Sequence, residues 1–396
     1  MKIFTKFVIF FIWFAAVFDP IGNLFGLRYL AMGFFLLNVT LIPIFIKIRL
    51  VDVYWRGTFI LVLSFIMPTY GCLIYFLHTR GEEFIDTSYL ASGLLILYSL
   101  LYWSKDITES ALRTMILILR LLVFVIFFSA FLQTQNSDVL NFFTERDIAI
   151  IGFRNYAGIQ FPYIYFLASP LLIFLLVYDL NKIVKKISFF NFISFFFTSV
   201  ALVLSGTRAH MLMPILVIPI YFLLKTSLVK KIYYLPGFIL IFIMTFFLSD
   251  TIFNLFKEFF SAKEGSNEVK ISLLSGYIEI FSNPFTFLFG QGYNAHEWSS
   301  VLRTMILMEN KASKTELTYI EILRVYGVFF FTIFIFMLYF LLKKLKSISS
   351  YYWLYLSFTL YLLNSSINPY LFSTNGMLPF GIVLAVVYFK SPNTSI

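Results

Sequence analysis

The sequence predicts an all-α polytopic membrane protein. It has about 12 apolar runs long enough to cross a bilayer as helices. Of its 396 residues, 60% are hydrophobic and only 13% are charged, whereas soluble domains are about half apolar and about a quarter charged. Apolar runs recur along the whole chain, separated by short polar clusters. The basic residues gather in alternate clusters, as expected when successive helices cross a membrane in opposite directions.

The individual spans follow from the apolar runs. A spanning helix needs about 20 apolar residues, which places helices near residues 3–18, 27–46, 57–77, 88–104, 113–132, 161–178, 189–205, 209–224, 233–250, 319–342, 350–365 and 376–389. Lys2 and Lys6 precede an apolar stretch that ends near Phe18, as in a signal peptide, but no small-x-small cleavage site follows it. We therefore expect the first run to be an uncleaved helix.

The distribution of Lys and Arg predicts the orientation. Alternate connections contain "KIRLVDVYWR", "KDITESALR", "KIVKK", "KTSLVKK" and "KKLK", and together with the termini they carry more than half of the 30 basic residues. The short loops on the other side hold Arg28, Arg80, Arg146, Arg154 and Arg208. Because short cytoplasmic loops collect Lys and Arg, both termini are expected in the cytoplasm. The same rule accounts for the net charge of +10 without a nucleic-acid partner.

One connection, residues 250–318, is long enough to form a sizeable periplasmic loop within a single integral membrane domain, residues 1–396. Its segment "TIFNLFKEFFSA" has the i, i+3, i+4, i+7 apolar spacing of an amphipathic helix, which we expect to lie on the membrane surface. A second helix, "KISLLSGYIEIF", is expected to end at "SNPF", before the loop "GQGYNAHEW".

Several kinds of chemistry are excluded by what the sequence lacks. His78, His210 and His296 are far apart and in no ligand spacing, so we expect no metal site. There is no G-x-x-x-x-G-K-[ST] phosphate loop, which argues against ATP-driven work. Cys72 is the only cysteine, so a disulfide framework is excluded. No cofactor is expected.

Polar residues concentrate on the predicted outer face. Arg208 and His210 lie in "LSGTRAHM", where one predicted helix ends and the next begins. The other candidates are Arg154 in the loop before the sixth helix and, in or after the long loop, His296, Arg303, Glu316, Glu321 and Arg324.

Simpler roles exist for these residues. Glu321 and Arg324 are three residues apart and can form a salt bridge on one helical face, and a lone Arg can anchor at lipid headgroups. Arg120, inside a predicted span, is expected to be structural, with its side chain snorkelling toward the cytoplasm. Several Arg residues from three loops on one side favour an anionic, lipid-linked substrate, because guanidinium groups bind phosphate oxygens in pairs.

The motifs "LSGTRAHMLMPIL", "NPFTFLFGQGYNAHEW" and "TELTYIEILRVYGVFFF", in this order, resemble the O-antigen polymerase (Wzy-type) family of the O-antigen ligase and polymerase group. The resemblance covers roughly residues 140–340. It implies a metal-independent glycosyltransferase of the bacterial inner membrane that joins repeat units carried on undecaprenyl diphosphate. It also implies an undecaprenyl-diphosphate-linked donor and acceptor as partners, together with membrane lipids, a flippase and a chain-length regulator.

The residues themselves suggest roles in such a reaction. Fixed cations stabilise a departing diphosphate, and Arg208, Arg154 and Arg303 are the candidates, with Arg324 and His210 as further substrate-binding residues. The attacking hydroxyl benefits from a base, for which His296, Glu316 and Glu321 are the candidates. Tyr293 and Trp298 flank His296 and could stack on sugar rings, or serve as interfacial aromatic residues.

Two other functions remain open. An O-antigen ligase would pass the glycan to lipid A-core, but ligases typically carry a His-Asn pair where this chain has Glu316, which favours a polymerase. A polysaccharide transporter or flippase commonly shows inverted repeats and broken helices around a midplane site, neither of which is evident in the sequence.

The charge asymmetry predicts the outcome of reporter fusions. Fusions after Lys186, Lys231 and Lys346 should report the cytoplasm, because these residues end Lys-rich connections. Fusions at Ser137 and Gly265 should report the periplasm. A cytoplasmic signal at Gly265 would reverse the orientation and place the candidate residues on the wrong side.

Overall fold

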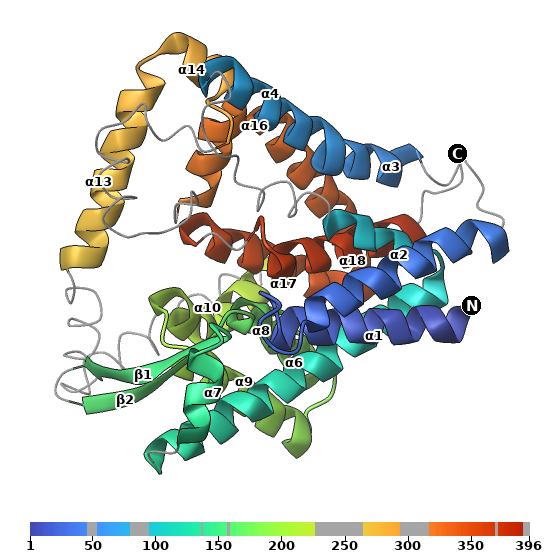
Figure 1. Ribbon diagram of the computed structural model, residues 1–396. Helices are drawn as coiled ribbons and strands as arrows, with labels where there is room; N and C mark the ends of the chain where they lie inside the picture. The colour runs from blue at the N-terminus through green and yellow to red at the C-terminus, as the bar shows by residue number, and fades with distance from the viewer. Residues whose placement is uncertain are drawn as a thin grey trace. The chain divides into compact units, whose positions relative to one another are not determined.

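The computed structural model describes residues 1–45, 54–79, 95–135, 138–156, 159–225, 264–293, 317–368 and 371–390. These residues are mostly helical (Figure 1). They group into two compact units, each described separately below. Unit 1 comprises Met1–Ala16, Tyr29–Met115 and Gly265–Ile396, and unit 2 comprises Val17–Arg28 and Ile116–Glu264.

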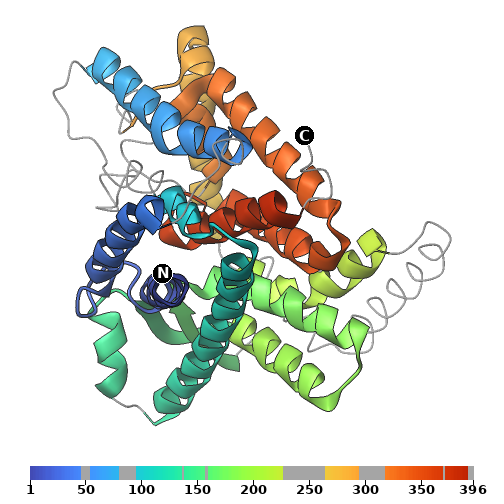
Figure 2. The same ribbon diagram turned by 90° about the vertical axis from the view of Figure 1, so that its right-hand side faces the viewer.

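Unit 2 is built on three helices that follow one another, α8 (Leu172–Lys185), α9 (Phe189–Leu204) and α10 (Arg208–Lys225), beside the C-terminal part of α6 (Lys105–Thr134). The α8 and α9 helices pack against each other as a helical hairpin (Figure 2). The side chain of Ser188 caps α9 by accepting a hydrogen bond from the Asn191 N–H, as expected for an N-cap serine. A short helix, α7 (Asn141–Thr144), precedes a pair of strands.

The strands β1 (Ala149–Tyr156) and β2 (Ile159–Phe166) form an antiparallel hairpin, so the prediction of an all-α fold, with a helix over 161–178, is wrong for this segment. The described chain is extended through Phe166, and α8 begins only at Leu172. The run "IQFPYIYF" is as apolar as a helix, but aromatic and β-branched residues favour strands. Pro162, opposite Phe153 in the hairpin, would break a helix interior.

Unit 1 contains most of α1 (Lys2–Phe18) and of α2 (Leu27–Phe45), joined by hydrogen bonds between Thr5 and Asn38. A continuous helical segment follows, made of α3 (Tyr54–Leu61), a π-helical stretch (Val62–Ile66) and α4 (Met67–Thr79). The remaining elements are the 3-10 helix Leu95–Leu101, α13 (Glu264–Phe281), α14 (Pro284–Phe289), α16 (Thr318–Lys346), α17 (Tyr352–Asn364) and α18 (Thr374–Lys390).

The core of unit 1 surrounds α18. Every residue from Asn375 to Val387 is buried, and Gly381 lies directly against Ser99 of the 3-10 helix. A helix that is apolar and buried all round is one in the middle of a bundle.

Most of the predicted spans coincide with helices, namely α1, α2, α3–α4, α6, α9, α10, α16, α17 and α18. The span predicted over 88–104 is described only from residue 95, where it is a 3-10 helix. The span predicted at 233–250 lies outside the described residues, and so does the predicted surface helix "TIFNLFKEFFSA". The predicted helix "KISLLSGYIEIF" is confirmed as part of α13, which ends at Phe281 before the predicted "SNPF".

Three helices of the described residues are long and apolar enough to cross a membrane: Arg56–Leu77, Lys105–Thr134 and Thr318–Lys346. Four shorter apolar helices accompany them, at Leu27–Ile42, Phe189–Leu204, Ala209–Lys225 and Thr374–Lys390. Large apolar side chains also point outward, with Phe124, Phe131 and Phe336 each more than 60% exposed. Such surfaces are expected where hydrocarbon replaces water around the protein.

Candidate functional site

In unit 1, the candidate residues Glu321 and Arg324 lie at a break in α16. Gly327 has φ 70° and ψ 173°, so the helix stops after Tyr326 and resumes beyond the glycine. Carbonyl groups in the last turn before such a break have no partner within the helix. Two of them are used by the loop after α14: Gln291 N–H donates to the Arg324 carbonyl (2.7 Å) and Gly292 N–H donates to the Val325 carbonyl (3.0 Å).

The break and the loop fit together because Gly327 has no side chain. Its backbone lies against the backbone of Leu288 and Phe289, where a Cβ atom would overlap the Leu288 carbonyl oxygen. A positive φ also strains any residue with a Cβ. The "GQGY" segment predicted as a loop is therefore confirmed as one in its described part, residues 290–293, and it is docked on the end of the first α16 segment.

A buried ion pair lies beneath this loop. The Arg324 guanidinium donates through Nε to Glu321 Oε2 (2.9 Å) and through Nη2 to Glu321 Oε1 (2.6 Å). Arg324 is fully buried and Glu321 is 3% exposed. The salt bridge expected from their spacing is thus confirmed, in the two-point geometry that makes Arg–carboxylate pairs strong.

Two residues from elsewhere in unit 1 complete the pair's hydrogen bonds. Tyr277 of α13 donates its hydroxyl proton to Glu321 Oε2 (2.7 Å), and Arg324 Nη1 donates to Gln291 Oε1 (3.2 Å). Buried charges are tolerated only when paired and hydrogen-bonded in this way. The network ties α13, α16 and the loop together, so the geometry favours a positioning role for Glu321 and Arg324. Gln291 Nε2, also buried, has no hydrogen-bond partner within the described residues.

Tyr293 anchors the far end of the loop. Its hydroxyl lies 2.8 Å from that of Tyr326, and its ring rests on Gly71 of α4. The Tyr70 hydroxyl donates to the Phe289 carbonyl (2.7 Å) on the same side. Because Tyr293 is fully buried, its ring is covered by protein in this conformation, which favours packing over stacking on a sugar. The only sequence signal for its burial is Gly71, which leaves room for the ring but lies far away in the chain.

In unit 2, the candidate residues Arg208 and His210 lie at the turn between α9 and α10. Gly206 has φ 65°, and its Cα lies against the Tyr163 ring of β2, so that a Cβ atom would overlap the ring. The Thr207 side chain then accepts a hydrogen bond from the His210 N–H (3.3 Å). This is an N-cap interaction, and it makes Arg208 the first residue of α10. The side chain of Arg208 is outside the described atoms.

His210 stabilises this turn from inside. It is fully buried, its ring lies parallel to that of Tyr165 at 6.2 Å, and its Nδ1 is 2.9 Å from Ser205 Oγ. The Ser205 hydroxyl donates its single proton to the Leu202 carbonyl (2.7 Å), so the imidazole N–H is the donor to Ser205. This geometry favours a structural role for His210 over contact with a substrate.

The β-hairpin brings Arg154 toward the same turn. Arg154 lies in β1 opposite Phe161, two residues beyond the pair that joins Gly152 to Tyr163. Tyr163 is the residue that contacts Gly206. At about 3.4 Å per strand residue, the Arg154 backbone is therefore about 7 Å along the strand from that contact. The Arg154 side chain is outside the described atoms.

The remaining candidates, His296, Trp298, Arg303 and Glu316, lie outside the described residues. Within the described ranges, no three His, Cys, Asp or Glu side chains come together as a metal site would require, and metal independence stays a prediction.

Comparison with known proteins gives no relative. No protein-family model matches the chain, and no curated protein or solved structure matches it significantly.

The buried ion pair makes a prediction about stability. Arg324→Met leaves the Glu321 carboxylate buried without its partner, which typically costs about 3–5 kcal/mol. The unfolding midpoint of detergent-solubilised protein in an SDS titration should fall accordingly. Replacing both residues, in Glu321→Leu with Arg324→Met, should cost less than the sum of the two single changes.

A matched control exists on α6. Arg113 pairs with Glu109 at 3.9 Å, with its side chain 83% exposed, and exposed pairs contribute about 1 kcal/mol or less. Arg113→Met should leave the midpoint almost unchanged. If Arg324→Met proves equally mild, the buried pair does not hold the loop on α16.

Proposed function

We propose that the chain is a glycosyltransferase that polymerises undecaprenyl-diphosphate-linked O-antigen repeat units at the periplasmic face of the bacterial inner membrane. The proposed topology has about 12 transmembrane helices, one for each apolar run long enough to cross a bilayer. Both termini lie in the cytoplasm, and residues 250–318 form the periplasmic loop. The proposed membrane location is supported by helices that are apolar and long enough to cross a membrane.

The observation that carries the proposal is the position of Arg208 at the start of α10, next to the hairpin that bears Arg154. The first N–H groups of a helix have no partner within the helix and carry a partial positive charge. Such a terminus favours phosphate oxygens, and an arginine at its first position adds a two-point donor. A diphosphate is the leaving group that this combination suits.

The reaction needs only two kinds of group from the protein. A sugar hydroxyl of one lipid-linked glycan attacks the anomeric carbon that bears the diphosphate of another, forming a glycosidic C–O bond. The bond between that carbon and the diphosphate oxygen breaks, and undecaprenyl diphosphate leaves with the electron pair. Arg208, Arg154 and Arg303 would stabilise the charge that develops on the diphosphate, and a base would accept the hydroxyl proton.

The contacts in unit 1 narrow the choice of base. Both carboxylate oxygens of Glu321 are held by Arg324, and one also by Tyr277, so an incoming proton would disrupt a buried ion pair. His296 and Glu316 are the better candidates. The Glu321–Arg324 network instead fixes the loop end at Tyr293, from which the segment with His296, Trp298 and Arg303 continues along the chain.

The transporter alternative is favoured by one observation, the break in α16 at Gly327. Broken helices in transporters leave backbone carbonyls free to coordinate ions. Here the carbonyls of Arg324 and Val325 already accept hydrogen bonds from loop N–H groups, which argues against an ion site at this break. The ligase alternative shares the chemistry of the polymerase and differs in the acceptor.

Gene deletion separates these functions by the surface lipopolysaccharide seen on a gel. Loss of a polymerase should leave core carrying a single repeat unit. Loss of a ligase would leave bare core with polymer stranded on the carrier lipid, and loss of a flippase would leave bare core without periplasmic polymer. Either of the last two patterns would contradict the proposal.

Substitution of Arg208 tests its proposed role. Arg208→Ala should abolish long chains, because loss of one transition-state donor typically costs about 3 kcal/mol, around a hundredfold in rate. Arg208→Lys should restore them only partly, because an ammonium group cannot form the paired contact. Ladder length on a gel, with protein abundance measured in parallel, gives the result.

Arg146 supplies the control. Its Nη1 donates to the Phe142 carbonyl (3.3 Å), and its guanidinium lies 4.0 Å from the centroid of the Phe142 ring, so both of these side-chain contacts are local. Arg146→Ala should keep long chains. Wild-type ladders from Arg208→Ala at normal abundance would leave Arg208 as a headgroup anchor.

Metal independence is a separate prediction. Purified protein in detergent should extend lipid-linked repeat units in excess chelator, because fixed guanidinium groups take the place of a metal cation at the diphosphate. Activity that is lost with chelator and restored by a divalent ion would show that a metal site exists.

A further inference from the structure

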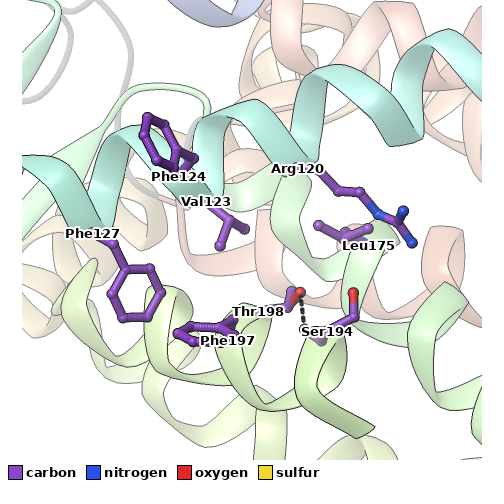
Figure 3. Close-up of a pocket in the computed structure, with 8 residues that line it drawn as sticks. All are labelled: Arg120, Val123, Phe124, Phe127, Leu175, Ser194, Phe197 and Thr198. Atoms are coloured by element: carbon purple, nitrogen blue, oxygen red, sulfur yellow. Dashed lines mark hydrogen bonds between the residues drawn. The ribbon is translucent and has the colours of Figure 1, made fainter. Parts of the chain in front are cut away.

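A pocket in unit 2 has none of the candidate site residues in its lining. It has a volume of about 310 Å³ and lies between α6 and α9, with Leu175 of α8 at its side (Figure 3). Figure 3 shows aromatic rings at one end of the pocket and Arg120 with Ser194 at the other. Most of its wall is apolar: Val123, Phe124, Phe127, Leu175 and Phe197.

The polar end is held by a buried carboxylate. Asp179 of α8 is 1% exposed, and its Oδ1 lies 3.5 Å from Arg120 Nη2. Its Oδ2 accepts hydrogen bonds from Ser194 (2.7 Å) and Thr198 (3.1 Å) of α9. The ion pair is long, and the Arg120 side chain remains 46% exposed. A guanidinium has five N–H donors, so within the described residues the contact with Asp179 at 3.5 Å occupies few of them.

The apolar end is also open to the outside. Phe124 is 68% exposed and Phe197 is 44% exposed, while Phe127 and Phe197 meet edge to face with centroids 5.1 Å apart. These rings form a wall of hydrocarbon character without any charged group among the lining residues other than Arg120. The pocket therefore offers a long apolar surface that ends at one cation.

The polar end of the pocket lies nearer than the apolar end to the corner between α8 and α9. Lys185, Lys186, Ile187, Phe189 and Phe190 are all exposed at this corner, a mixture of basic and large apolar side chains that is expected at a membrane interface. Ser194 lies only about 8 Å further along α9, at about 1.5 Å per residue. Along α6, Phe124 and Phe127 come after Arg120, and along α9, Phe197 comes after Ser194.

We propose that this pocket binds an anionic phospholipid, with an acyl chain along the phenylalanine wall and the phosphate on Arg120. Charge complementarity selects this occupant, because Lys182, Lys185 and Lys186 at the end of α8 add positive charge near the polar end, where Asp179 is the acid in contact with Arg120. The inference rests on the membrane location in the proposed function but not on glycosyl transfer.

The site gives Arg120 a role beyond snorkelling. A snorkelling side chain reaches water or any headgroup, whereas here Asp179 holds the guanidinium at the mouth of an apolar pocket. The carboxylate also neutralises part of the guanidinium charge that would attract a lipid phosphate. Removing it should therefore strengthen lipid binding, a result that a purely structural ion pair does not give.

The test uses the purified full chain in detergent and a phosphatidylglycerol with a fluorescent acyl chain. Arg120→Gln should weaken binding by about fivefold, the typical effect of one interfacial arginine on an anionic lipid. Val123→Trp, which fills the apolar part and leaves the ion pair intact, should also weaken binding. Asp179→Asn should tighten it.

Two control variants on α6 should bind like the wild type: Arg113→Gln, which removes a charge away from the pocket, and Leu117→Trp, which adds an indole at a position 51% exposed. Equal affinity for phosphatidylcholine, or displacement by inorganic phosphate as readily as by lipid, would overturn the proposal. So would normal binding by both Arg120→Gln and Val123→Trp. Because none of these measurements uses the polymer ladder, a failure here is distinguishable from a failure of the proposed glycosyltransferase.

Discussion

In unit 1, the ion pair between Glu321 and Arg324 is the interaction that joins α13 and the loop after α14 to α16. A buried carboxylate and guanidinium are stable only with nearly all their hydrogen bonds satisfied, and the missing partners come from Tyr277 and Gln291. Those two requirements place α13 and the loop after α14 against the first turns of α16. Once Gln291 is in position, its N–H group meets the Arg324 carbonyl that the break at Gly327 leaves unpaired. The loop after α14 is therefore held both by the Arg324 side chain and by the Arg324 backbone carbonyl.

Unit 2 also contains a buried carboxylate that is paired with an arginine and hydrogen-bonded to hydroxyl groups. Asp179 is buried, and its oxygens are shared among Arg120, Ser194 and Thr198, so that three helices meet at one carboxylate. The turn at Gly206 is fixed differently, by a glycine against an aromatic ring and by a threonine cap. In both units a buried carboxylate thus receives its partners from the protein itself, as expected where hydrocarbon replaces water.

Sequence alone predicts the helices well because an apolar run of sufficient length has few alternatives to a helix. It fails at residues 159–166, where hydropathy is that of a helix and only Pro162 and the β-favouring side chains indicate a strand. The spacing of Glu321 and Arg324 predicts their pairing, since that contact is local. Their bonds to Tyr277 and Gln291, and that of Arg120 to Asp179, join residues distant in sequence, which no local pattern encodes. The positions of Arg208 and Arg154 near one turn could likewise not be predicted, because they depend on the unexpected hairpin.

The break in α16, a helix long and apolar enough to cross a membrane, also has a consequence for how it would enter a bilayer. Residues 328–346 extend about 28 Å at about 1.5 Å per residue, close to the roughly 30 Å of the hydrocarbon layer. This part is free of charge until Lys343, so it can partition from the translocon into lipid without help from the rest of the chain. Residues 318–326 carry both members of the ion pair but add too little length to be needed for the crossing. Insertion of α16 and burial of its charges are therefore separable events, and the second can wait until α13 and the loop, which precede α16 in the chain, have packed against it.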